Sequence, residues 1–172
     1  LKRNFIVTFH PETTKNDTQQ KDFLKLLSVL SKQKETMIIF TMPNADSGNS
    51  KLNQLIKNFV KNNPSNSIYS ISMGQQLYFS VLKFVDICIG NSSSGIIEVP
   101  YFKKPTINIG TRQKGREQAL SIINCEATKD GINKAIQLSY SKNFKQKLLS
   151  NNNYIYKSIN TTKKMISIIN KI

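Results

Sequence analysis

Residues 87–98 read ICIGNSSSGIIE, an apolar run that passes through small polar residues into a helical pattern. The run Ile87 to Ile89 predicts a short buried strand, which Gly90 and Asn91 end. A short helix is expected to follow Ser93. A strand that leads directly into a helix is the repeating unit of parallel sheets, which helices cover on both faces.

The same alternation extends in both directions from this stretch. Further strands are predicted at residues 4–9, 37–40, 68–71 and 105–109, with a last short one within 119–125. Helices are predicted at residues 23–30, 52–60, 75–84 and 130–141. The expected fold is therefore α/β, a Rossmann-like parallel sheet flanked by helices, with residues 1–172 as one domain. A final apolar stripe, from Ile155 to Ile169, predicts a terminal helix that packs on this domain or on a missing neighbour.

Composition narrows the class of protein. The formal net charge is +15, but only three of the 25 basic residues are arginines and the lysines are scattered singly. We interpret this charge as a solvated surface, with a basic nucleic-acid-binding domain as the less favoured alternative. No apolar run is long enough to span a membrane, and Cys88 and Cys125 lie in apolar segments without metal-like spacing. A cytoplasmic protein is expected, and the start at Leu1, close before a strand, suggests a fragment.

Unusual polar residues gather where the predicted strands end. Ligands of open parallel sheets bind at these carboxyl ends. After the strand at 87–89, the small residues Ser92, Ser93 and Ser94 let backbone approach an anion, and the start of the following helix offers free N–H groups and about half a positive charge. Glu98 is placed to accept hydrogen bonds from ribose hydroxyls. The same letters also fit a purely structural serine cap with a glutamate in the first turn.

Two other strand ends carry candidates. His10, the only histidine, follows the first strand and can donate to a diphosphate or carry a proton, or else hydrogen bond to a nearby carbonyl. Residues 110–116, GTRQKGR, place Arg112 and Arg116 between glycines, a pattern that favours bidentate phosphate binding over a solvated surface loop. P-loop, GxGxxG, HExxH and CxxC motifs do not occur, so neither a metal nor another cofactor is expected. The residues predict a site for an anionic nucleotide, not a full catalyst.

Five ordered stretches resemble the C-terminal domain of UDP-N-acetylglucosamine 2-epimerases. They are residues 9–13 (FHPET), 43–48 (PNADSG), 72–75 (SMGQ), 90–95 (GNSSSG) and 104–116 (KPTINIGTRQKGR). The sequences NSSSGIIEVP and NIGTRQKGR are similar to those of the hydrolysing branch, which serves sialic-acid biosynthesis. The resemblance implies one half of a GT-B type fold, with the main acid/base carboxylates in an N-terminal domain that this chain lacks.

The resemblance also implies roles for single residues. His10 matches a histidine that contacts the diphosphate and assists catalysis, and it is the one catalytic candidate. The remaining UDP-binding candidates are Asn44, the backbone at Met73 for uracil, Ser92 and Ser93 for phosphate, Glu98 for ribose, Arg112 and, as a second arginine, Arg116.

The implied reaction converts UDP-GlcNAc and water to N-acetylmannosamine and UDP. The implied partners are UDP or UDP-GlcNAc and the N-terminal domain of the same protein, with no nucleic acid or membrane, and the full-length protein is expected to be a homo-oligomer. Relatives that act on another nucleotide sugar, such as a diacetamido-bacillosamine derivative, a non-hydrolysing 2-epimerase and a GT-B glycosyltransferase stay open as alternatives.

Overall fold

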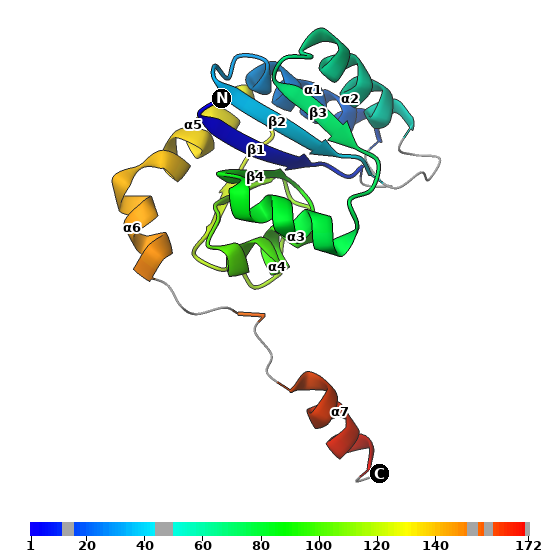
Figure 1. Ribbon diagram of the computed structural model, residues 1–172, viewed down its shortest axis with the longest axis vertical. Helices are drawn as coiled ribbons and strands as arrows, with labels where there is room; N and C mark the ends of the chain where they lie inside the picture. The colour runs from blue at the N-terminus through cyan, green and yellow to red at the C-terminus, as the bar shows by residue number, and fades with distance from the viewer. Residues whose placement is uncertain (12–15, 44–49, 151–154, 157–159, 171–172) are drawn as a thin grey trace.

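The computed structural model describes residues 1–11, 16–43, 50–150, 155–156 and 160–170. Helices separate the first five strands from one another, and the sixth strand follows the fifth without a helix between them (Figure 1). The strands are β1 (Arg3–Thr8), β2 (Thr36–Thr41), β3 (Ser67–Ser70), β4 (Ile87–Gly90), β5 (Thr106–Ile109) and β6 (Ile122–Cys125). The helices are α1 (Asn16–Leu30), α2 (Ser50–Asn62), α3 (Gly74–Phe84), α4 (Ser93–Ile97), the 3₁₀ helix η2 (Val99–Phe102), α5 (Lys129–Tyr140), α6 (Lys142–Ser150) and α7 (Thr161–Ile169).

All six strands are parallel and form one sheet in the order β3-β2-β1-β4-β5-β6. This order confirms the predicted Rossmann-like sheet. The chain builds outward from β1 to β3, crosses back through α3, and then builds outward from β4 to β6. The strand order therefore reverses between β1 and β4, and this is where an open parallel sheet leaves a crevice for ligands.

Alternation along the strands divides the core into two layers. Phe5 and Val7 of β1 face a large core that α1, α2 and α5 complete, whereas Ile6 faces a smaller core with Leu82 of α3 and Val99 of η2. Strands with helices on both faces must be apolar on both sides, which explains the near-continuous apolar runs in the sequence.

The C-terminal part differs from the prediction. Helix α6 was not predicted, because its pattern buries only Leu148 and therefore has little apolar periodicity. The terminal helix begins at Thr161, not at Ile155, and none of its residues is buried. Figure 1 shows α7 standing away from the sheet, so it does not pack on this domain. Within the part of the chain that the structure describes, no helix combines the length and the apolar character needed to cross a bilayer.

Candidate functional site

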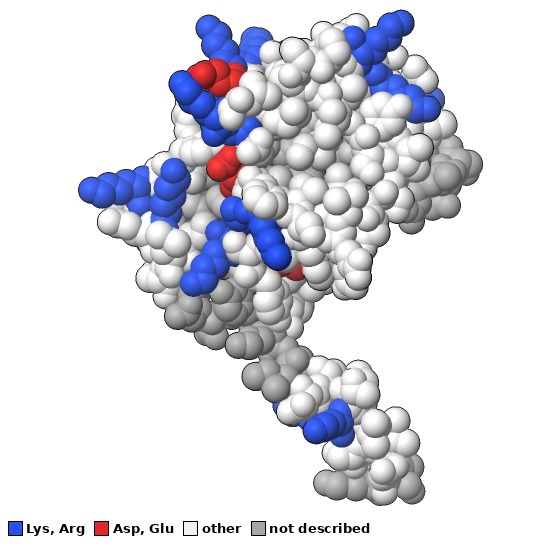
Figure 2. Space-filling view, viewed as in Figure 1, with Lys and Arg blue, Asp and Glu red and all other residues white. Residues whose placement is uncertain are grey.

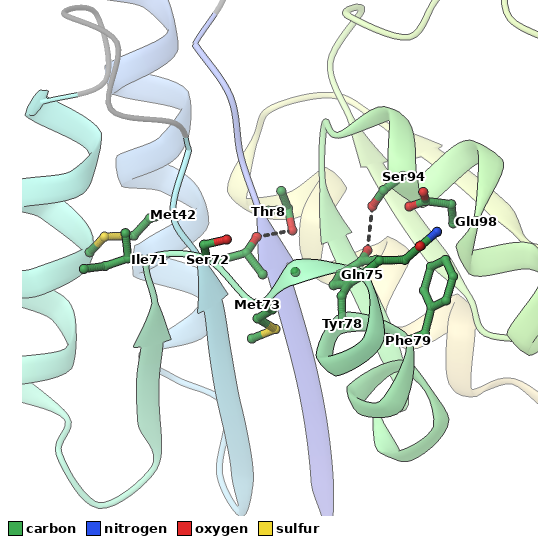
Figure 3. Close-up of a pocket in the computed structure, with 12 residues that line it drawn as sticks. Thr8, Met42, Ile71, Ser72, Met73, Gln75, Tyr78, Phe79, Ser94 and Glu98 are labelled. Atoms are coloured by element: carbon green, nitrogen blue, oxygen red, sulfur yellow. Dashed lines mark hydrogen bonds between the residues drawn. The ribbon is translucent and has the colours of Figure 1, made fainter.

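A cavity of about 340 Å³ opens beside the point where the strand order reverses (Figure 3). Thr8 and Thr41, at the ends of β1 and β2, join their hydroxyls at its base, consistent with their pairing in the sheet. The rest of the lining comes from the residues after β2 and β3, from α3 and from α4. These residues are Met42, Ile71, Ser72, Met73, Gly74, Gln75, Tyr78, Phe79, Ser94 and Glu98.

Asn91, the residue after β4, joins the two halves of the sheet at this point. Gly90 allows the join: its φ is +143°, and a Cβ there would lie 1.8 Å from the carbonyl oxygen of Thr8. No other residue fits so close to β1. The Asn91 backbone N–H donates to this Thr8 oxygen at 3.2 Å, and the residue is only 2% exposed.

The side chain of Asn91 holds the backbone of His10. Its Oδ1 accepts from the His10 N–H at 2.7 Å, and its Nδ2 donates to the His10 carbonyl at 2.8 Å. These two bonds continue the β1–β4 contact beyond the ends of both strands. The position of His10 therefore depends on Asn91.

The backbone carbonyl of Asn91 holds the loop after β5. It accepts from Nη1 of Arg112 at 3.0 Å and from Nε2 of Gln113 at 2.7 Å. Burial lowers the pKa of His10 below its usual 6.5, and the positive charge of Arg112 lowers this pKa further. Three separate strand ends thus meet at one asparagine, with a histidine and an arginine beside each other.

The serine turn leads from β4 into α4. Ser92 caps the helix, and its hydroxyl accepts from the backbone N–H of Ser94. The Ser94 hydroxyl is hydrogen bonded to the hydroxyl of Tyr78 on α3, which joins the two helices that flank the cavity (Figure 3). Burial raises the pKa of Tyr78, so this hydroxyl keeps its proton.

Helix α4 has only five residues, which corrects the expectation of about half a positive charge at its start. A helix of little more than one turn aligns few peptide dipoles, so the half positive charge expected at its start does not apply in full. Hydroxyl and N–H groups of the turn are what remain available to an anion. The helix is fixed against β5, because Oγ1 of Thr106 donates to the Gly95 carbonyl at 2.8 Å.

Glu98 and Met73 both line the cavity, Glu98 at the end of α4 and Met73 before α3 (Figure 3). Glu98 ends α4 and is half-buried, and this burial raises the pKa of its carboxyl. Met73 precedes α3, and Gly74 follows it with a φ of +61°, a left-handed conformation that suits glycine. A carboxylate acceptor and a turn of backbone therefore line the same space of ligand size.

The predicted site residues fall into three groups. Met73 and Glu98 line the cavity, while His10, Ser92, Ser93 and Arg112 surround the Asn91 join beside it. Arg116 lines a different hollow, beyond β5 and β6. Asn44 lies outside the described residues.

Several residues of the site were not singled out from the sequence. They are Thr8, Thr41, Tyr78, Asn91 and Gln113. Asn91 stood inside the GNSSSG stretch, and Gln113 stood between the arginines, so their place at strand ends was a usable signal. The role of Tyr78 depends on which side of α3 faces α4, and spacing along one helix does not carry that information.

The basic side chains do not merge into one field on the face that Figure 2 shows. They lie in several separate groups, some with Asp or Glu between them. The interpretation of the +15 charge as a solvated surface stays a prediction.

Comparisons with known proteins agree with the resemblance. A family model described as UDP-N-acetylglucosamine 2-epimerase matches residues 1–170. A Campylobacter jejuni protein named GDP/UDP-N,N'-diacetylbacillosamine 2-epimerase (hydrolyzing) is 39% identical over 145 residues, which are 84% of this chain and 37% of that protein. Polysialic acid biosynthesis protein P7 of Escherichia coli is 39% identical over 158 residues, which are 91% of this chain and 40% of that protein.

A solved structure shows the same fold. Staphylococcus aureus MnaA, in a co-structure with UDP, superposes with a TM-score of 0.76 at 14% identity over 99% of this chain and 45% of that chain. The superposition covers just under half of that protein, as expected for one half of a GT-B type fold. The chain spans about two fifths of the length of the two curated relatives. Because the family model matches nearly every residue, the chain belongs to the UDP-N-acetylglucosamine 2-epimerase family.

Proposed function

We propose that this chain is the UDP-binding half of a hydrolysing UDP-N-acetylglucosamine 2-epimerase. The observation that carries the proposal is the cavity at the reversal of strand order, which Met73 and Glu98 line and beside which Asn91 holds His10 and Arg112. Family membership and the names of the two similar proteins support it.

In the proposed complex, uracil meets the backbone at Met73 and the ribose hydroxyls donate to Glu98. The diphosphate lies over Ser92 and Ser93, with Arg112 and His10 closing from the neighbouring strand ends. Asn44 belongs to this proposal through the resemblance alone. Arg116 remains a predicted second arginine of this site, although it lines a separate hollow beyond β5 and β6.

The proposed reaction is an elimination followed by hydration. A base removes the proton at sugar C2, the C1–oxygen bond to UDP breaks, and a glycal forms; water then adds across the double bond to give N-acetylmannosamine. Binding energy at UDP fixes the sugar and stabilises the leaving diphosphate. His10 is the one catalytic candidate here, and its lowered pKa favours the neutral imidazole, the form that can accept a proton. We assign the main carboxylates to the N-terminal domain.

A second substrate has a specific observation in its favour. The Campylobacter relative carries diacetylbacillosamine and GDP/UDP in its name, so a diacetamido sugar or a GDP-linked donor is the competing proposal. The proposal also includes the supply of sialic-acid-like sugars and a homo-oligomeric full-length protein. It further includes a reducing compartment, which the two free cysteines favour.

Activity of the full-length protein tests this function. The purified protein is incubated separately with UDP-GlcNAc, UDP-diacetylbacillosamine and GDP-diacetylbacillosamine, and the released sugars are separated. Free N-acetylmannosamine with UDP is the expected product, and the 172-residue chain alone should bind UDP without turnover. Interconversion without release of UDP would mean a non-hydrolysing epimerase. Sugar transfer to an added acceptor would mean a glycosyltransferase.

A further inference from the structure

A second hollow, of about 390 Å³, lies beyond the ends of β5 and β6. Its lining residues are all polar or glycine; we refer to the three amides, Asn108, Gln118 and Asn124, as its floor and to Thr111, Lys114 and Arg116 as its rim. The sequence singled out residues 110–116, which carry two arginines, yet only Arg112 and Gln113 of this segment bind the Asn91 carbonyl beside the nucleotide cavity. The hollow is as large as the first cavity, and no role in the proposed reaction accounts for it.

The floor is a chain of three side-chain amides. Nδ2 of Asn108 donates to Oδ1 of Asn124 at 2.7 Å, and Nδ2 of Asn124 donates to Oε1 of Gln118 at 2.7 Å. Asn108 and Asn124 are paired across β5 and β6, which fixes their spacing. The direction of the bonds leaves a donor, Nε2 of Gln118, at one end of the chain and an acceptor, Oδ1 of Asn108, at the other.

Asn108 is an unusual residue for its position. It is 3% exposed and stands between Ile107 and Ile109 in a strand that is buried throughout. Burying an amide there costs stability compared with an apolar side chain, unless its hydrogen bonds are made. Asn108 donates to Asn124 across the sheet, so the buried strand accommodates an amide at this position.

The rim supplies positive charge. Gly115 adopts a left-handed φ of +86° between Lys114 and Arg116, and this turn brings both side chains to the same hollow. The three ion pairs found among the described residues involve neither of them. Two cations above donor and acceptor amides match a ligand that carries an oxyanion together with hydroxyl groups.

We propose that this hollow is a second binding site, distinct from the nucleotide cavity, for a small hydroxylated molecule with a phosphate or carboxylate group. Lys114 and Arg116 bind the oxyanion, and the amide floor binds the hydroxyls. A sugar phosphate and a sugar acid share this chemistry. Binding needs no other residue of the nucleotide site.

The segment 110–116 connects the two sites. Arg112 and Gln113 hold the Asn91 carbonyl, and the next residue, Lys114, lines the hollow. A ligand that orders Lys114 and Arg116 stabilises the loop in the arrangement that supports Asn91 and His10. We therefore expect positive coupling between the two sites, which rests on the proposed UDP site. The ligand raises the affinity for UDP, and UDP raises the affinity for the ligand by the same factor.

The binding test titrates the 172-residue chain with glucose 6-phosphate, glucuronate and glucose while NMR follows the side-chain amide signals of Asn108, Asn124 and Gln118. At least one anionic sugar should shift these signals, whereas glucose should not. The K114Q/R116Q variant should bind the anionic sugar at least about tenfold more weakly, because two charge-assisted contacts are lost. The matched variant K57Q/K61Q removes the same charge from exposed positions of α2 and should bind within about twofold of wild type.

Three results would overturn the second site. The first is that neither anionic sugar shifts the amide signals up to about 20 mM, because a site of lower affinity than this would not be a useful one. The second is equal weakening in both double variants, which would mean general attraction to a +15 protein. The third is a loss of UDP affinity in Arg116→Gln, without added sugar, as large as the loss in Arg112→Gln, which would return Arg116 to the nucleotide site.

The coupling is measured separately by UDP titration with and without the saturating sugar. UDP should bind about twofold to tenfold more tightly in its presence, and the K114Q/R116Q variant should lose this gain. An unchanged UDP affinity would remove the coupling. Sugar binding at the hollow in a chain that fails to bind UDP would leave the second site standing and refute the proposed function instead.

Discussion

Replacing Asn91 with alanine tests the join between the strands. The substitution removes both hydrogen bonds to the His10 backbone, at 2.7 and 2.8 Å, in a place where Asn91 is 2% exposed. Each buried backbone group left without a partner costs about 1–3 kcal/mol, and His10 is half-buried, so water recovers part of this cost. We expect a loss of about 2–4 kcal/mol in the free energy of unfolding, and a Tm lower by about 5–15 °C.

Urea denaturation of wild type, Asn91→Ala and Asn58→Ala measures this loss. Asn58 is an exposed amide on α2 whose Oδ1 accepts from Gln54, so Asn58→Ala should stay within about 0.5 kcal/mol of wild type. UDP affinity of Asn91→Ala, taken at a temperature where it is folded, should fall as well because the His10 backbone loses both of its hydrogen bonds to the Asn91 side chain, whereas the backbone carbonyl that binds Arg112 is kept. A loss below about 1 kcal/mol with unchanged UDP affinity would refute the role of Asn91 as the join.

Three further predictions concern ligand contacts and the terminal helix. Glu98→Gln should weaken the binding of UDP by about 1.5–3 kcal/mol and the binding of inorganic pyrophosphate hardly at all. Calorimetry measures both affinities, with Glu117→Gln as the exposed control. Equal losses for both ligands would mean that Glu98 only supports the structure of the site. The free His10 has a lowered pKa, and a bound diphosphate raises it, so UDP affinity should be highest at low pH and should begin to fall below pH 6.5. Titrations from about pH 5 to 8.5 should show this fall in wild type and a flat profile in His10→Ala. Matching profiles in the two proteins would mean that the histidine is structural. Removing residues 160–172 should change the free energy of unfolding by less than about 0.5 kcal/mol, since every described residue of α7 is exposed, and a loss above about 1 kcal/mol in urea would show that α7 packs on this domain.

Most of the sheet could be predicted because buried parallel strands are apolar on both faces. Runs such as residues 87–90 and 106–109 are distinctive for this reason, and helices such as α2 show their buried face through the spacing of Leu52, Ile56 and Phe59. Helix α6 lacks this signal, since one buried residue makes no stripe. For α7 the stripe is present, but a stripe does not say which surface it covers.

The site was predicted where a residue's place at a strand end was enough. Met73 and Glu98 come to one cavity because the carboxyl ends of parallel strands share an edge of the sheet. Spacing did not show that Arg112 binds the Asn91 carbonyl while Arg116, four residues later, lines a separate hollow, because the left-handed Gly115 turns the chain between them. The bond from Tyr78 to Ser94 depends likewise on how two helices pack.

The most direct test of the nucleotide site is NMR mapping of UDP on the isotopically labelled 172-residue chain. The account predicts saturable binding of one UDP, with the largest backbone shifts at His10, Met73, Ser94 and Glu98, and no comparable effect of a duplex oligonucleotide at moderate salt. Shifts scattered over exposed lysines, or a salt-dependent response to the duplex with none to UDP, would contradict it.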